Sequence, residues 1–258
     1  MNKGKYKILK NTITACDYTY VLQIIKQTIK SRNRLLVSPI ASQTLVRAYY
    51  DQKIFNALES IDLLLPDSQW VKWSIWFLYG VRLKKRVYGP ELMKKICELS
   101  EKETYPIYLY GSTNQVLLKL KERLLQLCPM IQIVGSKESK FRDLNSKEIS
   151  ELISQIYNSK AKILFIGLGS PLQELFSAEI AKKNIQTNTP IAIISIGAAF
   201  DFIAGTKKQA PRWVGDCGFE WLYRLLHEPK RLWRRYFSCG LLYLWLVVLQ
   251  KIDKKNEK

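Results

Sequence analysis

The stretch AKILFIGLGS, residues 161–170, is the clearest indication of the fold class of this chain. It is a near-continuous apolar run that ends in glycine and serine, which is typical of a strand buried on both faces of a parallel sheet. Helix-like segments precede it at 146–158 and follow it at 171–183. Because parallel sheets are built from strands that alternate with helices, this stretch predicts one strand of an α/β fold.

The same alternation extends along most of the chain. Almost every apolar segment ends in Gly, Ser, Pro or Asp. The pattern predicts a Rossmann-like α/β fold, with a mostly parallel sheet, helices on both faces and a ligand crevice outside the carboxyl ends of the strands. The further predicted strands are 34–41, 61–68, 105–112, 130–136 and 190–200; the further predicted helices are 42–60, 70–80 and 114–127, and residues 8–29 are a strand or turn followed by a helix.

The composition changes after about Ala204, where Arg, Lys and Trp become frequent. We therefore divide the chain into a Rossmann-like domain, 1–204, and a basic, aromatic, helical C-terminal appendage, 205–258. The stretch GFEWLYRLLHEPKRLWRRYF, 218–237, is helix-like, and on one helix its arginines at 224, 231 and 235 share a face. That face indicates an anionic partner; the alternative is a solvated basic surface.

The charge of the whole chain supports an anionic partner. The 258 residues include 41 Lys and Arg against 22 Asp and Glu, a formal net charge of +19. Such an excess favours nucleic acid, anionic lipid or a phosphorylated substrate, the alternative being a basic surface without a specific partner. Nucleic-acid binding is the weaker prediction, because no RRM, KH, helix-turn-helix or zinc signature is present.

Other function classes are disfavoured by what the sequence lacks. The five cysteines show no metal-binding spacing and His227 is the single histidine, so neither a zinc site nor Ser-His-Asp catalysis is expected. We find no Asp-x-Asp motif and no Walker P-loop, and because the first residues contain no apolar segment of signal-peptide length, secretion is not expected. The longest apolar run, 236–249, is shorter than the roughly 20 residues that a membrane-spanning helix needs.

Two strand ends carry the first candidate site residues. In GLGSPLQE, 167–174, the glycines allow a ligand to approach the main chain, and we expect Gln173 and Glu174 to point toward the ligand edge. Glycines also end strands for purely steric reasons. Asp67 ends LLLPD, where it is either a general base or the N-cap of the next helix.

Two further residues have two possible interpretations each. Asp201 follows SIGAAF and is either an acceptor for a ribose, a sugar or an arginine, or a buried acid paired locally. Arg86, in KKRVYGPELM, is either a phosphate contact or a surface residue.

Taken together, the motifs resemble the WecG/TagA/CpsF glycosyltransferases, glycosyltransferase family 26. The resemblance covers roughly residues 34–237. It is carried by LLLPDSQWVKW, KKRVYGPELM, YLYGS, CPMIQIVGS, ILFIGLGSPLQE, IGAAFDFIAGTKKQAPRW and GFEWLYRLLHEPKRLWRRYF, in the family's order.

The resemblance implies an enzyme without a cofactor or a metal ion. It would transfer a sugar, with inversion, from a UDP-sugar to a polyprenyl-diphosphate-linked acceptor at the inner face of the cell membrane, in the synthesis of exopolysaccharide, teichoic acid or a related surface glycan. Asp67 matches the family's proposed base, and Arg224 matches an appendage arginine thought to neutralise the diphosphate. The residues expected to bind substrate or UDP are Ser38, Arg86, Gly111, Gly169, Gln173, Asp201 and Arg224.

The sequence departs from the family pattern at two places. The family often has T-x-N after its early strand, whereas this chain has Ser38 followed by Ile40, so the asparagine is lost. The usual Asp-Gly is Asp67-Ser68. These changes suggest a donor other than the N-acetylmannosamine type, in an exopolysaccharide branch. They also leave open a degenerate protein kept as a non-catalytic assembly partner.

The appendage is expected to be an active-site lid and a membrane contact. An apolar segment at 236–249 lies between groups of basic residues, as in helices that lie on anionic lipid. The alternative is a helix at an oligomer interface, since a homo-oligomer is possible. The residues expected to contact the membrane are Arg231, Arg234, Arg235 and Trp245.

Overall fold

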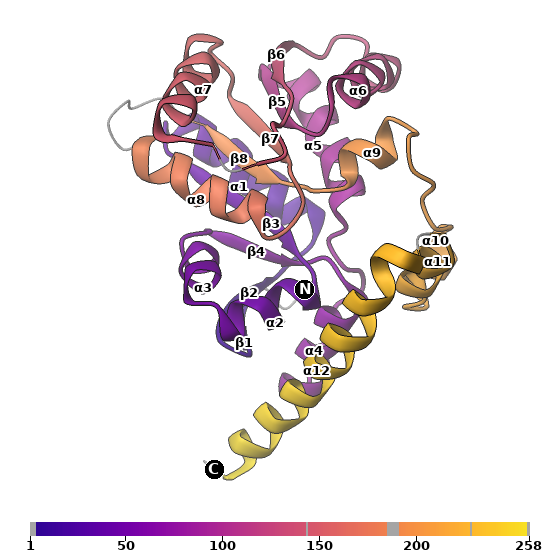
Figure 1. Ribbon diagram of the computed structural model, residues 1–258. Helices are drawn as coiled ribbons and strands as arrows, with labels where there is room; N and C mark the ends of the chain where they lie inside the picture. The colour runs from indigo at the N-terminus through magenta and orange to yellow at the C-terminus, as the bar shows by residue number, and fades with distance from the viewer. Residues whose placement is uncertain (1–3, 143, 185–190, 228, 257–258) are drawn as a thin grey trace.

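The computed structural model describes residues 4–142, 144–184, 191–227 and 229–256 (Figure 1), and the side chains of 212, 216, 224 and 231–237 lie outside this description. Its centre is a six-stranded parallel sheet in the order β4-β3-β8-β7-β5-β6. The predicted parallel α/β fold is therefore confirmed. The strands are β3 (Leu35–Ile40), β4 (Leu63–Pro66), β5 (Ile107–Gly111), β6 (Ile133–Lys137), β7 (Ile163–Gly167) and β8 (Ala192–Ser195).

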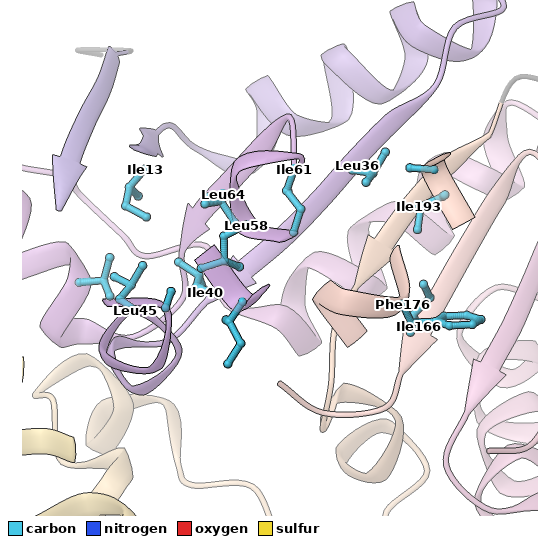
Figure 2. Packing of buried hydrophobic residues seen from close by; sticks show 14 of the residues in the cluster. Ile13, Leu36, Ile40, Leu45, Leu58, Ile61, Leu64, Ile166, Phe176 and Ile193 are labelled. Atoms are coloured by element: carbon cyan, nitrogen blue, oxygen red, sulfur yellow. The ribbon is translucent and has the colours of Figure 1, made fainter. Parts of the chain in front are cut away.

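Helices cover both faces of the sheet. Successive strand residues point to opposite sides, and since both sets are apolar, each face must be covered. Leu36 and Ile40 of β3 belong to one buried cluster, part of which Figure 2 shows, and Leu35 and Val37 belong to the other. Helices α2 (Ser42–Tyr50), α3 (Gln52–Glu59), α4 (Gln69–Tyr79), α7 (Ser146–Asn158) and α8 (Leu172–Asn184) contribute to the first cluster. Helices α1 (Tyr18–Lys30), α5 (Gly89–Lys102), α6 (Asn114–Leu127) and α9 (Ala199–Ile203) contribute to the second.

Two elements near the N-terminus differ from the prediction. The strand or turn expected before α1 is an antiparallel hairpin, β1 (Gly4–Ile8) with β2 (Asn11–Ala15). The single helix predicted over 42–60 is wrong, because Asp51 divides it into α2 and α3. The Asp51 carboxylate accepts from the amides of Lys53 and Ile54 at 2.8 and 3.2 Å, and this N-cap starts a new helix.

The C-terminal part is helical, as predicted, but its main segment is not one helix. It consists of α10 (Arg212–Asp216), α11 (Glu220–His227) and α12 (Pro229–Asn256). The prediction of a single helix over 218–237 is wrong. Arg224 belongs to α11 whereas Arg231 and Arg235 belong to α12, so the three arginines do not share a face of one helix. Proline is favoured in a first helical turn, and Pro229 opens α12.

Helix α12 runs back along the domain and packs against α2 and α4 (Figure 1). Tyr243, Leu246 and Val247 on its inner face are buried. The Tyr243 hydroxyl lies 2.8 Å from that of Ser74 in α4, and Gln250 accepts from the amide of Leu9 at 2.8 Å. The end of the chain is thus anchored on the N-terminal hairpin and its neighbours.

Within the described ranges, no helix is both long enough and apolar enough to cross a membrane.

Candidate functional site

A cavity of about 750 Å³ opens at the carboxyl ends of the parallel strands, where the topology predicts a ligand crevice. Its lining includes the predicted residues Asp67, Arg86, Gly169, Gln173 and Asp201. The other side is formed by the C-terminal helices. They contribute Glu220, Trp221 and Tyr223 from α11 and Gly240, Leu241, Tyr243 and Leu244 from α12.

Asp67 follows the edge strand β4, and its carboxylate is held by the main chain. Its Oδ1 accepts from the amide of Gly89, the first residue of α5, at 2.9 Å. The N-terminus of a helix stabilises a nearby negative charge. The alternative that Asp67 caps α4 is wrong, because Ser68 is the N-cap and accepts from the amide of Val71. Asp67 is also in the lining of the cavity.

Arg86 connects the turn at Asp67 with the appendage. Its guanidinium donates to the Asp67 carbonyl at 3.1 Å and forms an ion pair with Glu220 of α11. Both side chains of the pair are largely buried, at 13% and 14% exposed, so Arg86 is not a surface residue. Burial lowers the pKa of Arg86, but the charges of Glu220 and Asp67 outweigh this effect and the pKa is raised.

The two predicted glycines have different roles. Gly169 lines the cavity after β7 and has a φ of +79°, a conformation that other residues rarely adopt. Gly111 does not line the cavity. A Cβ on Gly111 would lie 2.5 Å from the carbonyl oxygen of Gly167, so this glycine allows the ends of β5 and β7 to approach closely. Ser112, the next residue, is in the lining.

Behind the cavity lies a group of buried polar side chains. Gln173 is in the lining, whereas Glu174, expected beside it at the ligand edge, is fully buried. One carboxyl oxygen of Glu174, Oε1, accepts from Gln173 Nε2 and from Ser38 Oγ, each at 2.9 Å. Burial raises the pKa of Glu174. Ser38 is fully buried as well and lies outside the lining; its neighbour Pro39 reaches the cavity.

Asp201 lies in α9, with its side chain 23% exposed. Its carboxylate is 3.4 Å from the Thr206 hydroxyl and 3.9 Å from the Lys207 ammonium. Lys207 and Lys208 line the cavity too. This part of the site therefore combines one carboxylate with two cations, a set that suits the hydroxyls and phosphates of a nucleotide.

Two residues in the lining were not predicted from the sequence. Phe141 has its ring 71% exposed and a φ of +53°. Its loop is held by Glu148, which pairs with Lys140 and Arg142 at 2.7 and 2.6 Å, and these contacts lower the pKa of Glu148. A lone aromatic in a polar loop carries no periodic signal. Glu220 was also missed, although an isolated carboxylate in a basic segment indicates an ion pair.

Some expected residues are described only in part. Arg224 lies in α11 and Arg231, Arg234 and Arg235 lie in α12, but these four side chains fall outside the described residues. The Trp245 side chain is described and is 60% exposed on α12. Among the described residues, no group of three or more His, Cys, Asp or Glu side chains is arranged to hold a metal ion.

Comparisons with known proteins show what the chain is similar to. The model of the glycosyl transferase WecG/TagA/CpsF family matches residues 6–257. An N-acetylglucosaminyldiphosphoundecaprenol N-acetyl-beta-D-mannosaminyltransferase of Bacillus subtilis strain 168 is 27% identical over 239 residues, which cover 92% of this chain and 88% of that protein. A protein of the same name from Bacillus spizizenii strain W23 is 31% identical over 181 residues, covering 70% of this chain and 66% of that protein.

Proposed function

We propose that this chain, which belongs to the WecG/TagA/CpsF family of glycosyltransferases, transfers a sugar from a UDP-sugar to a polyprenyl-diphosphate-linked acceptor. The proposed transfer inverts the anomeric centre and needs no metal ion. The names of its Bacillus relatives give such an acceptor for those proteins. One observation carries the proposal: the Asp67 carboxylate lies in the same cavity as the strand-end turn at Gly169 and the appendage residues of α11.

Asp67 is the general base in this proposal. The acceptor hydroxyl attacks the anomeric carbon of the donor and gives its proton to the carboxylate, the bond from that carbon to the UDP oxygen breaks, and UDP leaves. Attack opposite the leaving group inverts the anomeric centre. The hydrogen bond from Gly89 fixes the carboxylate during this step.

The departing UDP needs positive charge. Lys207 and Lys208 line the cavity, and the turn at Gly169 leads into the N-terminus of α8, which favours a nearby negative charge. Arg224 lies on α11 and is the appendage residue that we assign to the diphosphate. Arg86 already pairs with Glu220, so we assign it to holding the site together. Charges fixed in advance around a developing anion provide the main catalytic effect in many enzymes.

The donor sugar is proposed to differ from N-acetylmannosamine. Ile40, which stands where the family often has asparagine, is fully buried and belongs to the core. An apolar core residue cannot offer the polar contact that an asparagine provides. The pocket is therefore expected to accept another UDP-sugar.

The appendage, 205–258, is proposed to be both the lid of the site and the membrane contact of a peripheral enzyme on the inner face of the membrane. The outer face of α12 exposes Leu241, Leu244, Trp245, Val248 and Ile252, and we call these residues the apolar stripe. A helix with an exposed apolar face among basic residues binds anionic lipid surfaces. Since Leu241 and Leu244 also line the cavity, the stripe extends from the membrane side to the active site.

The test is UDP release by the full chain with a panel of UDP-sugars and a polyprenyl-diphosphate-linked N-acetylglucosamine in anionic vesicles. We expect acceptor-dependent release with one donor, undiminished by a chelator. If none of the UDP-sugars supports UDP release, the alternative of a non-catalytic assembly partner would be favoured. A requirement for added metal would contradict metal independence.

A further inference from the structure

Two polar atoms beneath the cavity have no hydrogen-bond partner among the described residues. They are Oε1 of Gln173, whose side chain is 3% exposed, and Oε2 of Glu174, which is fully buried. A buried polar atom without a partner destabilises the fold, so most of them are satisfied. Since Gln173 borders the cavity, a bound ligand can supply the partner that its oxygen lacks.

Glu174 determines which end of the Gln173 amide faces the cavity. The amide nitrogen donates to Glu174 Oε1, so the amide oxygen points away from this carboxyl group. That oxygen lies beside Gly197, where an added Cβ would be 3.2 Å from it, and Gly197 is in the lining. Ser38 donates to the same carboxyl oxygen and helps to fix it. The amide therefore presents a hydrogen-bond acceptor to the ligand.

The order of the strands indicates which part of the ligand this acceptor meets. Asp67 follows β4, Gly197 follows β8, two strands further along the sheet, and Gly169 follows the next strand, β7. With the anomeric carbon near Asp67 and the diphosphate at the glycine turn, the sugar lies between them, over β3 and β8. An acceptor oxygen repels phosphate but suits a sugar hydroxyl or an amide N–H.

We propose that Glu174 is a positioning residue for sugar recognition: it holds the Gln173 amide so that its oxygen accepts a hydrogen bond from a hydroxyl or amide N–H of the transferred sugar. This inference rests on the proposed glycosyltransferase reaction and adds a residue that acts behind the site.

The test compares Gln173→Ala, Glu174→Ala and the double variant by KM and kcat for the UDP-sugar and by inhibition with UDP alone. We expect each single change to raise KM about tenfold, the effect of one lost hydrogen bond, with kcat and the UDP inhibition constant within about twofold. The double variant should be no worse than Gln173→Ala, because both changes remove the same contact. Glu174→Gln keeps an acceptor oxygen and should return KM to within about threefold of wild type.

A matched control is Ser177→Ala, which removes a buried hydroxyl from the same helix. Ser177 bonds to the Gln173 carbonyl and to Ser195, each at 2.7 Å, and does not line the cavity. It should lower thermal stability without changing KM. Should Glu174→Ala fail to fold, Glu174→Asp, which withdraws the acceptor by one methylene, replaces it.

Three outcomes with an active wild type would overturn the assignment of Glu174. The effects of Gln173→Ala and Glu174→Ala on KM could be additive in the double variant, Glu174→Gln could raise KM as much as Glu174→Ala, or the affinity for UDP could fall as much as that for the UDP-sugar. A wild-type chain that turns over no UDP-sugar would instead overturn the proposed function, and the assignment with it.

Discussion

The strand-end side of the cavity and its C-terminal side are held in different ways. On the first side, polar groups are fixed by helices that pack on the sheet: Asp67 by the amide of Gly89 in α5, and Gln173 by the buried carboxyl of Glu174 in α8. On the second side, α11 meets the strand ends through the ion pair of Glu220 with Arg86. Groups that must be placed accurately are thus held by buried or partly buried hydrogen bonds, whereas α11 is held to the strand ends by an ion pair between two side chains.

Helix α12 shows the same division within one element. Its inner face is part of the core and its outer face exposes the apolar stripe. Anchoring and lipid binding are therefore separate properties of the two faces. The proposed assignments can be tested by changing one region while the other stays intact.

The largest effect is expected for Asp67→Asn. Asparagine has nearly the same shape but cannot take a proton, so we expect turnover to fall by about 10²–10⁴-fold while UDP affinity stays within about twofold. Single-turnover rates and calorimetric UDP titration measure the two quantities. The matched control is Asp51→Asn at the N-cap of α3, where asparagine caps equally well and activity should be unchanged. Undiminished turnover in Asp67→Asn would exclude this residue as the base.

The second-largest effect on activity is expected for the ion pair between Arg86 and Glu220, which joins the two sides of the cavity. Glu220→Ala leaves the guanidinium of Arg86 without its buried carboxylate and releases α11, and we expect kcat/KM to fall ten- to a hundredfold. The charge-reversed pair Arg86→Glu with Glu220→Arg should recover part of the loss relative to either single change.

The control for the ion pair is Glu103→Ala, which removes the partner of Lys26 in a more exposed pair. This change should leave kcat/KM unchanged, because neither residue lines the cavity. An increase in activity for Glu220→Ala would show instead that the ion pair restrains the enzyme.

The contrast between the two sides also explains what the sequence could reveal. Strands β3, β4, β5, β7 and β8 were found because strands buried on both faces are continuous apolar runs, whereas β6 is partly exposed and was found from a shorter apolar run. Asp67 and Gln173 were found because they follow buried strands. The family assignment and the glycosyltransferase class were confirmed by a family match over residues 6–257.

The remaining features depend on contacts between distant segments. Ser38 and Glu174 are 136 positions apart, and their buried hydrogen bond exists only once α8 packs on β3. The apolar segment 236–249 was predicted as one lipid-facing unit, but Tyr243, Leu246 and Val247 are buried against the domain. Helical periodicity could have separated these two faces, whereas the partner of the inner face follows only from the tertiary fold.

A smaller effect is expected when the apolar stripe is made polar. Trp245 and Ile252 are 60% and 50% exposed and do not line the cavity, so Trp245→Ser with Ile252→Ser removes apolar area from the outer face alone. We expect binding to anionic vesicles to weaken at least about tenfold, measured by flotation, with the thermal midpoint unchanged.

The matched control for the stripe is Leu118→Ser with Met130→Ser, exposed apolar residues that are part of α6 and the segment after it. Equal losses of vesicle binding in both double variants would contradict a specific lipid-binding face on α12.

The smallest effect is expected for Gln250→Ala. This side chain accepts from the amide of Leu9 at 2.8 Å and donates to the carbonyl of Lys7 at 2.9 Å, so it ties α12 to the N-terminal hairpin. Loss of these bonds should lower the free energy of unfolding by about 1 kcal/mol and the thermal midpoint by about 2–4 °C, measured by calorimetry. Because Gln250 lies outside the cavity lining, kcat should not change. A tenfold fall in kcat would mean that anchoring of α12 and catalysis are coupled, and the two sides of the site would then have to be treated as one unit.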